Sequence, residues 1–303
     1  MVKLPSDSAY GNAALLRRKL KNRGIIMAPG VFNPIAALVA SKVGFNTLYF
    51  SGGGFAMSMG LPDLGIITMS EMVQAVRYIL DRVKLPLIVD VDTGFGEAIN
   101  IGRAVHELEN MDVAALHIED QVMPKKCGHL PGKQVVGTEE MVKRIVAAKE
   151  STRKGIVLIA RTDARAVEGM DATVERARAY AGAGADMIFP EALKTREEFK
   201  EFSKKVGVPL LANMTEFGES PYMTASELER IGYKIVIFPM TALRASLMTM
   251  EDVYSEIKRL GTQRELLGRL MTREDSYGLI DYYSYEAFDS KAARSAAAVL
   301  KSL

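Results

Sequence analysis

The stretch of residues 117–129, HIEDQVMPKKCGH, gathers more reactive side chains than its neighbours. It holds two lysines, two of the three histidines and the only cysteine of the 303-residue chain. Lys125, Lys126 and His129 lie close to Cys127 in the sequence, and cations beside a thiol lower its pKa. We therefore interpret Cys127 as a thiol that exchanges a proton near neutral pH, the alternative being an incidental cysteine in a basic loop.

A second group of acids has the spacing of a metal site. Asp90 and Asp92 stand at positions i and i+2 directly after an apolar run, so both carboxylates lie on one side of the chain. Oxygen ligands without histidine suit a hard cation, and Mg²⁺ takes only one or two carboxylates besides water and substrate. The sequence predicts Mg²⁺ or Mn²⁺ held by Asp90, Asp92 and Glu119, the alternative being solvated acids at a strand end.

Other residues could bind a carboxylate of a substrate. Ser51, Gly52 and Gly53 offer backbone N–H groups that side chains do not obstruct, an arrangement that binds anions. Arg161 follows an apolar run and Arg244 opens a predicted helix, where a guanidinium can bind a carboxylate through two hydrogen bonds. An ordinary turn and solvated arginines are the alternatives.

Eight short apolar runs must position these side chains. Their centres are spaced by about 30 residues, the length of a strand, a helix and two loops. Stretches with helical periodicity lie between them, as at residues 70–82, 139–149, 171–181 and 225–230. The runs are residues 25–27, 47–50, 87–89, 113–118, 156–159, 187–189, 210–211 and 235–238.

A polar or small group follows nearly every run, which is typical of a barrel enzyme whose site lies at the carboxyl ends of its strands. The sequence therefore predicts an α/β fold, a (β/α)₈ TIM-type barrel forming one domain over residues 1–303, with residues 261–303 as a helical C-terminal extension. The extension includes helical segments near residues 264–271 and 287–302. A doubly wound sheet is the alternative, but no Gly-x-Gly-x-x-Gly follows the first run.

Composition excludes several other classes of protein. The formal net charge is only +2, from 39 basic and 37 acidic residues spread along the chain, so nucleic acid is not an expected partner. One cysteine excludes an internal disulfide, and no apolar run approaches the roughly 18 residues of a membrane span. The first twenty residues lack the apolar core of a signal peptide, so we expect a cytoplasmic protein.

The pentapeptide Lys125-Lys126-Cys127-Gly128-His129 resembles the signature of the isocitrate lyase and phosphoenolpyruvate mutase superfamily. The resemblance extends over residues 29–273. It implies a lyase in which Cys127 is the proton donor, with Lys125 and His129 as electrostatic support. It also implies that substrate contacts Cys127 and Gly128, together with Glu191, Asn213, Thr215, Arg244 and Arg273.

The implied reaction is a metal-assisted retro-aldol cleavage of 2-methylisocitrate to pyruvate and succinate, part of the methylcitrate cycle of propionate breakdown. Tyr49, Asp63 and Glu119 are candidates for the base that takes the hydroxyl proton, and the sequence does not choose among them. Isocitrate and 2,3-dimethylmalate are alternative substrates, and phosphoenolpyruvate mutase chemistry and a non-enzymatic binding barrel are weaker alternatives. Isocitrate lyases carry tryptophan where Phe189 stands, and this chain has no tryptophan. The resemblance further implies a homotetramer in which the C-terminal helices pack on a neighbouring subunit.

Overall fold

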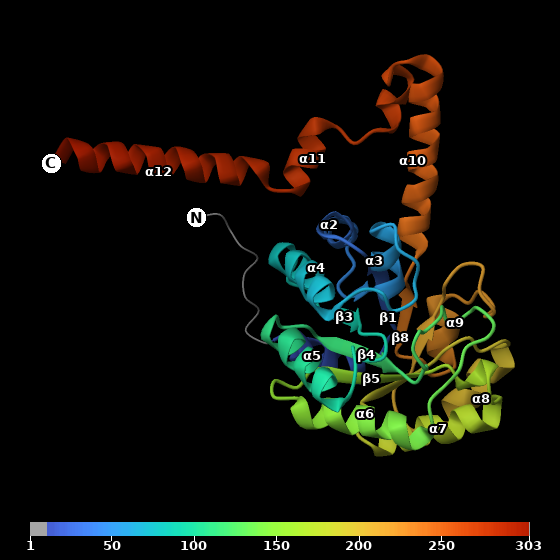
Figure 1. Cartoon of the computed structure of the whole chain (residues 1–303). Helices are drawn as coiled ribbons and strands as arrows, with labels where there is room; N and C mark the ends of the chain where they lie inside the picture. The colour runs from blue at the N-terminus through green and yellow to red at the C-terminus, as the bar shows by residue number, and fades with distance from the viewer. Residues whose placement is uncertain (1–10, 303) are drawn as a thin grey trace.

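Eight parallel strands form the centre of the protein, a computed structural model that describes residues 11–302. The strand order is β6-β5-β4-β3-β2-β1-β8-β7, and a parallel bridge between Ile188 and Leu210 joins β6 to β7. The sheet therefore closes into a barrel (Figure 1). The strands are β1 (Ile26–Val31), β2 (Leu48–Phe50), β3 (Leu87–Asp90), β4 (Ala115–Glu119), β5 (Val157–Thr162), β6 (Met187–Pro190), β7 (Leu211–Asn213) and β8 (Ile235–Phe238).

Alternate residues of each strand pack into two separate cores. Ile88 belongs to a cluster that also contains Tyr49, Ile159 and Phe189, and all four side chains are buried. The flanking residues of β3, such as Val89, belong to a larger cluster shared with the surrounding helices. Because strand side chains alternate between faces, the first cluster fills the barrel and the second lies between sheet and helices.

Apart from α1, which precedes β1, helices follow the strands and lie around the outside of the barrel (Figure 1). Several begin at a side chain that caps the first turn, as at Thr68, whose hydroxyl and Glu71 form a reciprocal capping box. Gly44 ends one helix with a φ of 104°, a conformation that favours glycine. The helices of the barrel are α1 (Asn12–Lys21), α2 (Pro34–Val43), α3 (Gly52–Ser58), α4 (Met69–Arg82), α5 (Ala98–Asn110), α6 (Thr138–Ser151), η1 (Ala164–Ala166), α7 (Met170–Gly182), α8 (Arg196–Lys205) and α9 (Ala225–Arg230).

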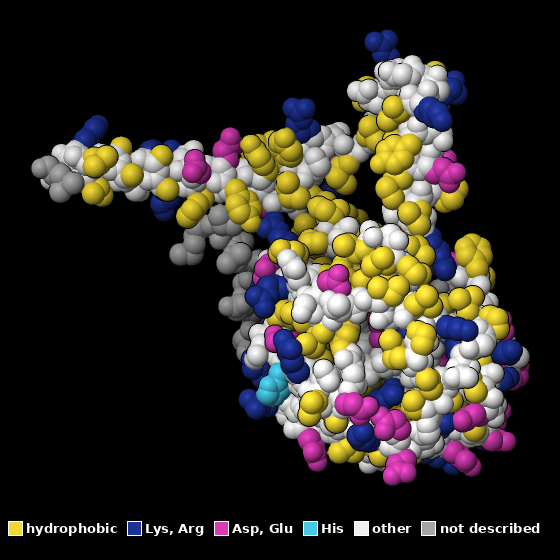
Figure 2. All heavy atoms as spheres, viewed as in Figure 1, with side chains coloured by type: hydrophobic (Ala, Val, Ile, Leu, Met, Phe, Trp, Pro, Cys, Tyr) yellow, Lys and Arg dark blue, Asp and Glu magenta, His cyan; other side chains and the backbone are white. Residues whose placement is uncertain are grey.

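The C-terminal segment leaves the barrel as an arm. Helix α10 (Thr241–Leu260) rises from the barrel, and η2 (Arg264–Arg269), α11 (Arg273–Leu279) and α12 (Tyr282–Ser302) continue from its far end (Figure 1). No residue of α11 or α12 is buried. Hydrophobic side chains gather along α10 and α12 in Figure 2, so the arm carries apolar surface that its own barrel does not cover.

The predicted barrel and its C-terminal helices are confirmed, and each of the eight apolar runs corresponds to one strand. The predicted helix near residues 264–271 is a 3₁₀ segment, η2, and the prediction missed α1, α3 and α11. The single-domain assignment for residues 1–303 stays a prediction, and its residues 1–10 and 303 lie outside the described residues. Within residues 11–302, no helix is both long and apolar enough to cross a membrane.

Candidate active site

The predicted polar residues meet at the carboxyl ends of the strands. Asp90, Glu119 and Asn213 are the last residues of β3, β4 and β7, and Glu191 directly follows β6. Glu119 and Glu191 are almost fully buried. Since parallel strands of a barrel end at one face, these side chains share a single region, as expected for a barrel enzyme.

Arg161 lies at the centre of this region. Its Nε atom is 2.9 Å from Oδ2 of Asp163 and 3.3 Å from Oε2 of Glu119, and its Nη2 atom is 3.3 Å from Oε2 of Glu191. Its guanidinium also lies 5.2 Å from the centre of the Phe189 ring. Burial opposes the charge, but the three carboxylates outweigh it and raise the pKa of Arg161 well above its ordinary value. The guanidinium is therefore a fixed positive charge.

Glu191 joins Arg161 to the cysteine loop. Its Oε1 atom lies 2.8 Å from Nε2 of His129, and Asn213 donates a 3.2 Å hydrogen bond to Oε2. Burial alone would raise the pKa of Glu191, but Arg161 and then His129 hold it below its usual range. Glu191 is therefore ionised at neutral pH.

Tyr49 and His117 lie inside the barrel below these charges. The Tyr49 hydroxyl is 2.7 Å from Nε2 of His117, which in turn lies 3.5 Å from Oδ1 of Asp90. Burial raises the pKa of Tyr49 well above its ordinary value and lowers the pKa of His117 to about 3. Both side chains are therefore uncharged near neutral pH.

The two aspartates of the predicted metal site lie side by side. Asp90 accepts hydrogen bonds from the backbone N–H groups of Asp92, at 3.0 Å, and of Gly52, at 3.2 Å. Lys125 pairs with Asp63 and with Oδ1 of Asp92. Burial raises the pKa of Asp90, and burial together with Asp90 raises that of Asp92. The buried carboxylates thus need positive charge nearby.

Ser51, Gly52 and Gly53 form the start of helix α3 and not the simple turn that was the alternative. The Ser51 hydroxyl accepts a 3.0 Å hydrogen bond from Gly54 and caps the helix. A side chain on Gly53 would come within 2.8 Å of Asp63. The close approach of this backbone to Asp63 and Asp90 explains why glycine stands at both positions.

The donor set fits a hard cation that keeps most of its water. Asp90 and Asp92 supply the one or two carboxylates that Mg²⁺ usually takes from a protein. Among residues 11–302, however, no three His, Cys, Asp or Glu side chains converge closely enough to hold a metal ion. Glu119 therefore does not complete a three-residue cage with the aspartates in this arrangement. Its two oxygens are buried without a hydrogen bond.

Cys127 is half-buried, and one expectation about it is wrong. Burial raises the pKa of the Cys127 thiol above its ordinary value, and a backbone hydrogen bond from His129 opposes this only partly. The lysines were expected to lower it, but Lys125 pairs with Asp63 and Asp92 while the Lys126 side chain points to Gly132. The thiol consequently stays protonated at neutral pH.

Some predicted residues lie at the edge of the site or outside it. Thr215 is half-buried after β7. Arg244 donates hydrogen bonds of 2.8 and 2.7 Å to the carbonyl and carboxylate of Glu216 and lies over the Phe217 ring. Arg273 is exposed on the arm, at the first residue of α11. In the described part of the chain, no hydrogen bond or ion pair joins Arg273 to the other predicted residues.

Sequence reasoning did not assign roles to several buried polar residues of the site. His117 was noticed in the cysteine stretch but received no role. Gln121, Lys133 and Asp163 are each buried and contact the cysteine loop or Arg161. The signal that could have revealed them is their position, since Asp163 directly follows β5 and the other two flank the signature pentapeptide.

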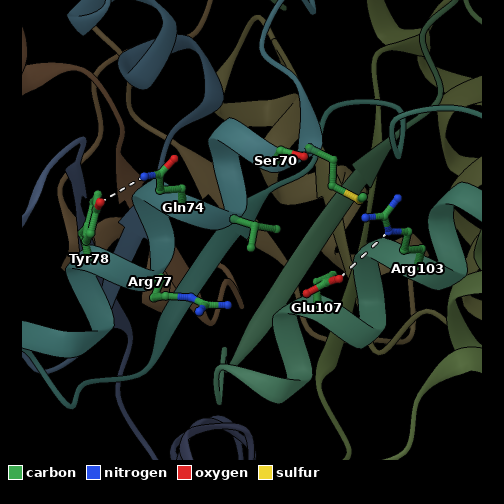
Figure 3. Close-up of a pocket in the computed structure, with 8 residues that line it drawn as sticks. Ser70, Gln74, Arg77, Tyr78, Arg103 and Glu107 are labelled. Atoms are coloured by element: carbon green, nitrogen blue, oxygen red, sulfur yellow. Dashed lines mark hydrogen bonds and ion pairs between the residues drawn. The ribbon is translucent and has the colours of Figure 1, made fainter.

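Two cavities differ in their relation to this region. One, of about 400 Å³, lies on the outside of the barrel between α4 and α5, where Gln74 and Arg77 of α4 line it with Arg103 and Glu107 of α5 (Figure 3). It contains none of the predicted site residues. The other, of about 460 Å³, borders the cysteine loop. It is lined by Gly128, His129, Leu130, Pro131, Gly132, Lys133, Ala166, Val167, Ala192, Lys194 and Glu219.

Comparison with known proteins places the chain among enzymes with this barrel. Residues 16–258 match the family model described as phosphoenolpyruvate phosphomutase. The chain is 53% identical over 286 residues to the 2-methylisocitrate lyase of Aeropyrum pernix, covering 94% of this chain and 92% of that protein.

Solved structures of enzymes are also similar to this chain in both sequence and fold. A crystal structure of 2,3-dimethylmalate lyase is 37% identical, with a TM-score of 0.88 over 94% of this chain and 96% of that one. A phosphonopyruvate hydrolase in complex with oxalate and Mg²⁺ is 30% identical, with a TM-score of 0.84 over 92% of this chain and 98% of that one.

Proposed function

The chain belongs to the phosphoenolpyruvate phosphomutase family, and from this premise we propose that it is a carbon–carbon lyase that cleaves 2-methylisocitrate into pyruvate and succinate. One observation carries the proposal: a protonated thiol, Cys127, lies on a loop whose Gly128 packs against Arg161 and Glu191. A lyase that forms a carbanion needs an acid at such a place. The 53% identical relative carries the name 2-methylisocitrate lyase.

The cleavage requires a base, an anion-binding region and an acid. A base takes the proton of the C2 hydroxyl, the C2–C3 bond breaks, and the C2 oxygen becomes the carbonyl of pyruvate. The electron pair of the broken bond moves to C3, beside a carboxylate. Cys127 then donates its proton to C3, and succinate forms.

Each of the three candidate bases has a feature that opposes the role. Burial raises the pKa of Tyr49 well above its ordinary value, so its phenol is a hydrogen-bond donor and not a base. Asp63 is already paired with Lys125. Both oxygens of Glu119 lack hydrogen bonds, but Oε2 lies 3.3 Å from Nε of Arg161, and burial raises the pKa of Glu119 well above its ordinary value, which favours the protonated acid over the base.

The remaining predicted residues bind or orient the substrate in this proposal. Arg161 supplies a fixed positive charge, while Ser51, Gly52 and Gly53 present the start of α3. Asn213 and His129 hold Glu191 in place. The assignment of Thr215, Arg244 and Arg273 to substrate binding rests on the family resemblance alone.

Mg²⁺ or Mn²⁺ is the proposed cofactor, and the hydrolase relative was solved with Mg²⁺. Asp90 and Asp92 would hold it, directly or through water. When bound, such a cation lowers the pKa of a chelated hydroxyl and polarises the developing carbonyl.

A related substrate is the second candidate. The 2,3-dimethylmalate lyase structure shares 37% identity and almost the whole fold. Its substrate also has a hydroxyl beside a cleavable C–C bond, so the same residues could serve it. Phosphoenolpyruvate mutase chemistry is less favoured, because it offers no role for the Cys127 thiol as a proton donor.

We also propose that the arm packs on neighbouring copies to form a homotetramer. Helix α12 has 21 residues and none of them is buried, although helices in proteins gain most of their stability by packing an apolar face. Apolar side chains on α10, such as Met248 and Tyr254, are also exposed. Light scattering of the full chain gives its mass, and a monomer would contradict the proposal. Membership of the methylcitrate cycle and a cytoplasmic location stay predictions.

The substrate experiment compares three compounds in parallel. Chromatography would measure succinate together with the second product, which is pyruvate from 2-methylisocitrate and glyoxylate from isocitrate. Release of pyruvate from 2,3-dimethylmalate would reveal the alternative substrate. If no carbon–carbon cleavage is seen with any of the three in the presence of Mg²⁺ or Mn²⁺, the proposed function is wrong.

A further inference from the structure

We propose that Gln121 and Lys133 are positioning residues that hold the backbone on either side of Cys127, one through Lys126 and the other through Gly128. The catalytic consequence rests on the proposed function, but the geometry does not. In this proposal neither side chain takes part in the reaction as an acid, base or nucleophile. Each acts through the loop.

Gln121 fixes the backbone before the thiol. Its side chain is nearly inaccessible, and its Nε2 atom donates a 2.8 Å hydrogen bond to the carbonyl oxygen of Lys126. Its Oε1 atom accepts a 2.9 Å hydrogen bond from the N–H group of the same residue. One amide thus binds both polar groups of Lys126, as a neighbouring strand would, and fixes the orientation of the residue that precedes Cys127.

Lys133 fixes the backbone after the thiol. Its Nζ atom donates to the carbonyl oxygen of Gly128 and lies 3.1 Å from Oδ1 of Asp163. The exposed fraction of the side chain is 2% for Lys133 and 0% for Asp163. A buried ammonium is costly unless it is paired, so this ion pair holds Nζ beside the loop carbonyl. The loop is thereby tied to a carboxylate at the end of β5.

The barrel in turn holds Asp163. Its N–H group donates a 2.9 Å hydrogen bond to Oδ1 of Asp120, and its Oδ2 atom accepts a 2.9 Å hydrogen bond from Arg161. Gln121 follows Asp120 just after β4, and Asp163, the partner of Lys133, directly follows β5, so both contacts connect the loop to strand ends. The positions of Lys126 and Gly128 are therefore set by the barrel and not by the loop alone.

The backbone at Gly128 has no room for a side chain. A Cβ atom on this glycine would overlap the side chains of Glu191 and Arg161. The loop therefore packs its backbone directly onto the charged centre of the site, and a small outward movement would separate Cys127 from it. Proton donation requires hydrogen-bond distance, so such a movement reduces turnover.

Alkylation of the thiol tests this inference without any substrate. Cys127 is the only cysteine, so the rate of its reaction with iodoacetamide reports one site. Lys133→Met keeps most of the apolar stem and removes the charged anchor. If the loop is released, the half-buried thiol becomes more accessible and alkylation should accelerate about tenfold or more, the effect of losing one hydrogen bond to a charged group.

The direction of the change separates release of the loop from loss of charge. Removing a nearby cation without moving the loop raises the thiol pKa and slows alkylation. Lys126→Met is the matched control, because its ammonium also donates to a loop carbonyl, that of Gly132, but its side chain is exposed. This control should not accelerate the reaction. Alkylation of the Lys133→Met protein at or below the parental rate, with an unchanged melting temperature, overturns the proposal.

Gln121→Ala tests the other anchor and keeps the proposal testable if Lys133→Met does not fold. It should also accelerate alkylation, and an unchanged rate in a folded protein excludes Gln121 as an anchor. On the substrate identified above, both variants should lose kcat by about tenfold or more with KM within about threefold. If the variants are alkylated faster but the parent protein cleaves none of the three compounds, the proposed function is refuted while the loop anchors are supported.

Discussion

The Nζ atom of Lys125 lies 2.8 Å from Oδ1 of Asp92, so an ion pair joins the cysteine loop to the segment after β3. Lys125 also pairs with Asp63. Burial opposes the charge of Lys125, but the surrounding carboxylates, with Asp92 the strongest, raise its pKa well above the ordinary value. A cation held by Asp92 would share this carboxylate with Lys125, which links the proposed metal site to the loop.

The first prediction concerns this metal site. Asp90→Ala and Asp92→Ala each remove an oxygen ligand and a negative charge, so each should lower kcat/KM by at least about a hundredfold. Activity is measured as turnover after a chelator has removed bound metal and Mg²⁺ has been added back. Binding of Mn²⁺, followed by electron paramagnetic resonance, should weaken in both variants and does not depend on turnover.

Glu97→Ala is the matched acidic control, because Glu97 is exposed and paired only with Lys143 among the described contacts. It should bind Mn²⁺ as the parent does. Parental activity of both aspartate variants after exhaustive chelation would show that the metal assignment is wrong.

Replacement of the thiol tests the proposed acid. Cys127→Ser should lower kcat by about a hundredfold or more, since an alcohol is a much weaker acid than a thiol and general acids contribute about 10²–10⁴-fold. KM should change by less than about threefold, because the substitution leaves Arg161 and Glu191 in place. Steady-state kinetics separates the two parameters, and an unchanged melting temperature shows that the fold is kept. Parental turnover would remove Cys127 from the mechanism.

The acidity of the thiol gives a prediction with a definite sign. Burial disfavours the thiolate and raises the pKa of Cys127, and only the thiolate reacts with iodoacetamide. The alkylation rate should therefore keep rising above pH about 8.5, the ordinary thiol value. The same measurement in urea provides the control, because the unfolded chain should titrate near the ordinary value. A midpoint below neutral pH in the folded protein would contradict the burial argument.

The sequence was sufficient to predict the barrel because periodic apolar strands and glycine-ended helices are local features. Asp90, Asp92 and Glu119 could be recognised for a related reason, since they stand at or near strand ends, whereas Glu191 was assigned through the family resemblance. The prediction of those three acids needed only the general rule that barrel enzymes place polar residues at this position.

Pairing between distant residues could not be predicted in the same way. The pKa of Cys127 was expected to be low because Lys125 and Lys126 are its sequence neighbours. In the structure the Lys125 ammonium forms ion pairs with Asp63 and Asp92, which lie far away in the sequence. Burial is then the largest influence on the pKa of the Cys127 thiol. The buried contact between Lys133 and Asp163 was missed for the same reason.

A stability prediction concerns Glu109 at the end of α5. Its carboxylate is buried and accepts hydrogen bonds from the backbone N–H groups of Arg153, Lys154 and Ile156, at 2.8, 3.0 and 3.1 Å. Glu109→Ala leaves three donors without this partner and should lower the free energy of unfolding by about 2–4 kcal/mol. Urea unfolding followed by circular dichroism provides the measurement.

Glu107→Ala is the control on the same helix, since Glu107 makes only a 4.0 Å ion pair with Arg103 among its described contacts. Its effect should stay within about 0.5 kcal/mol. Equal effects of the two substitutions would show that the hydrogen bonds to the loop before β5 do not stabilise the fold.

The last prediction concerns the choice between 2-methylisocitrate and isocitrate. Phe189 is fully buried, with its ring edge-on to His117 and under the guanidinium of Arg161, 5.5 and 5.2 Å away between centres. A pocket that accommodates one extra methyl group favours the methylated substrate by about 1–3 kcal/mol, so kcat/KM should be at least about tenfold higher for 2-methylisocitrate.

Phe189→Trp tests the cause of this preference. Because the phenyl ring has no exposed surface, an indole must push Arg161 or His117 toward the place where substrate binds. We therefore expect a lower ratio of kcat/KM between the two substrates, together with lower activity on both. Phe189→Leu, which adds no volume, should keep the preference. An unchanged ratio in the Phe189→Trp protein would mean that the methyl group is recognised elsewhere, even if the lyase mechanism holds.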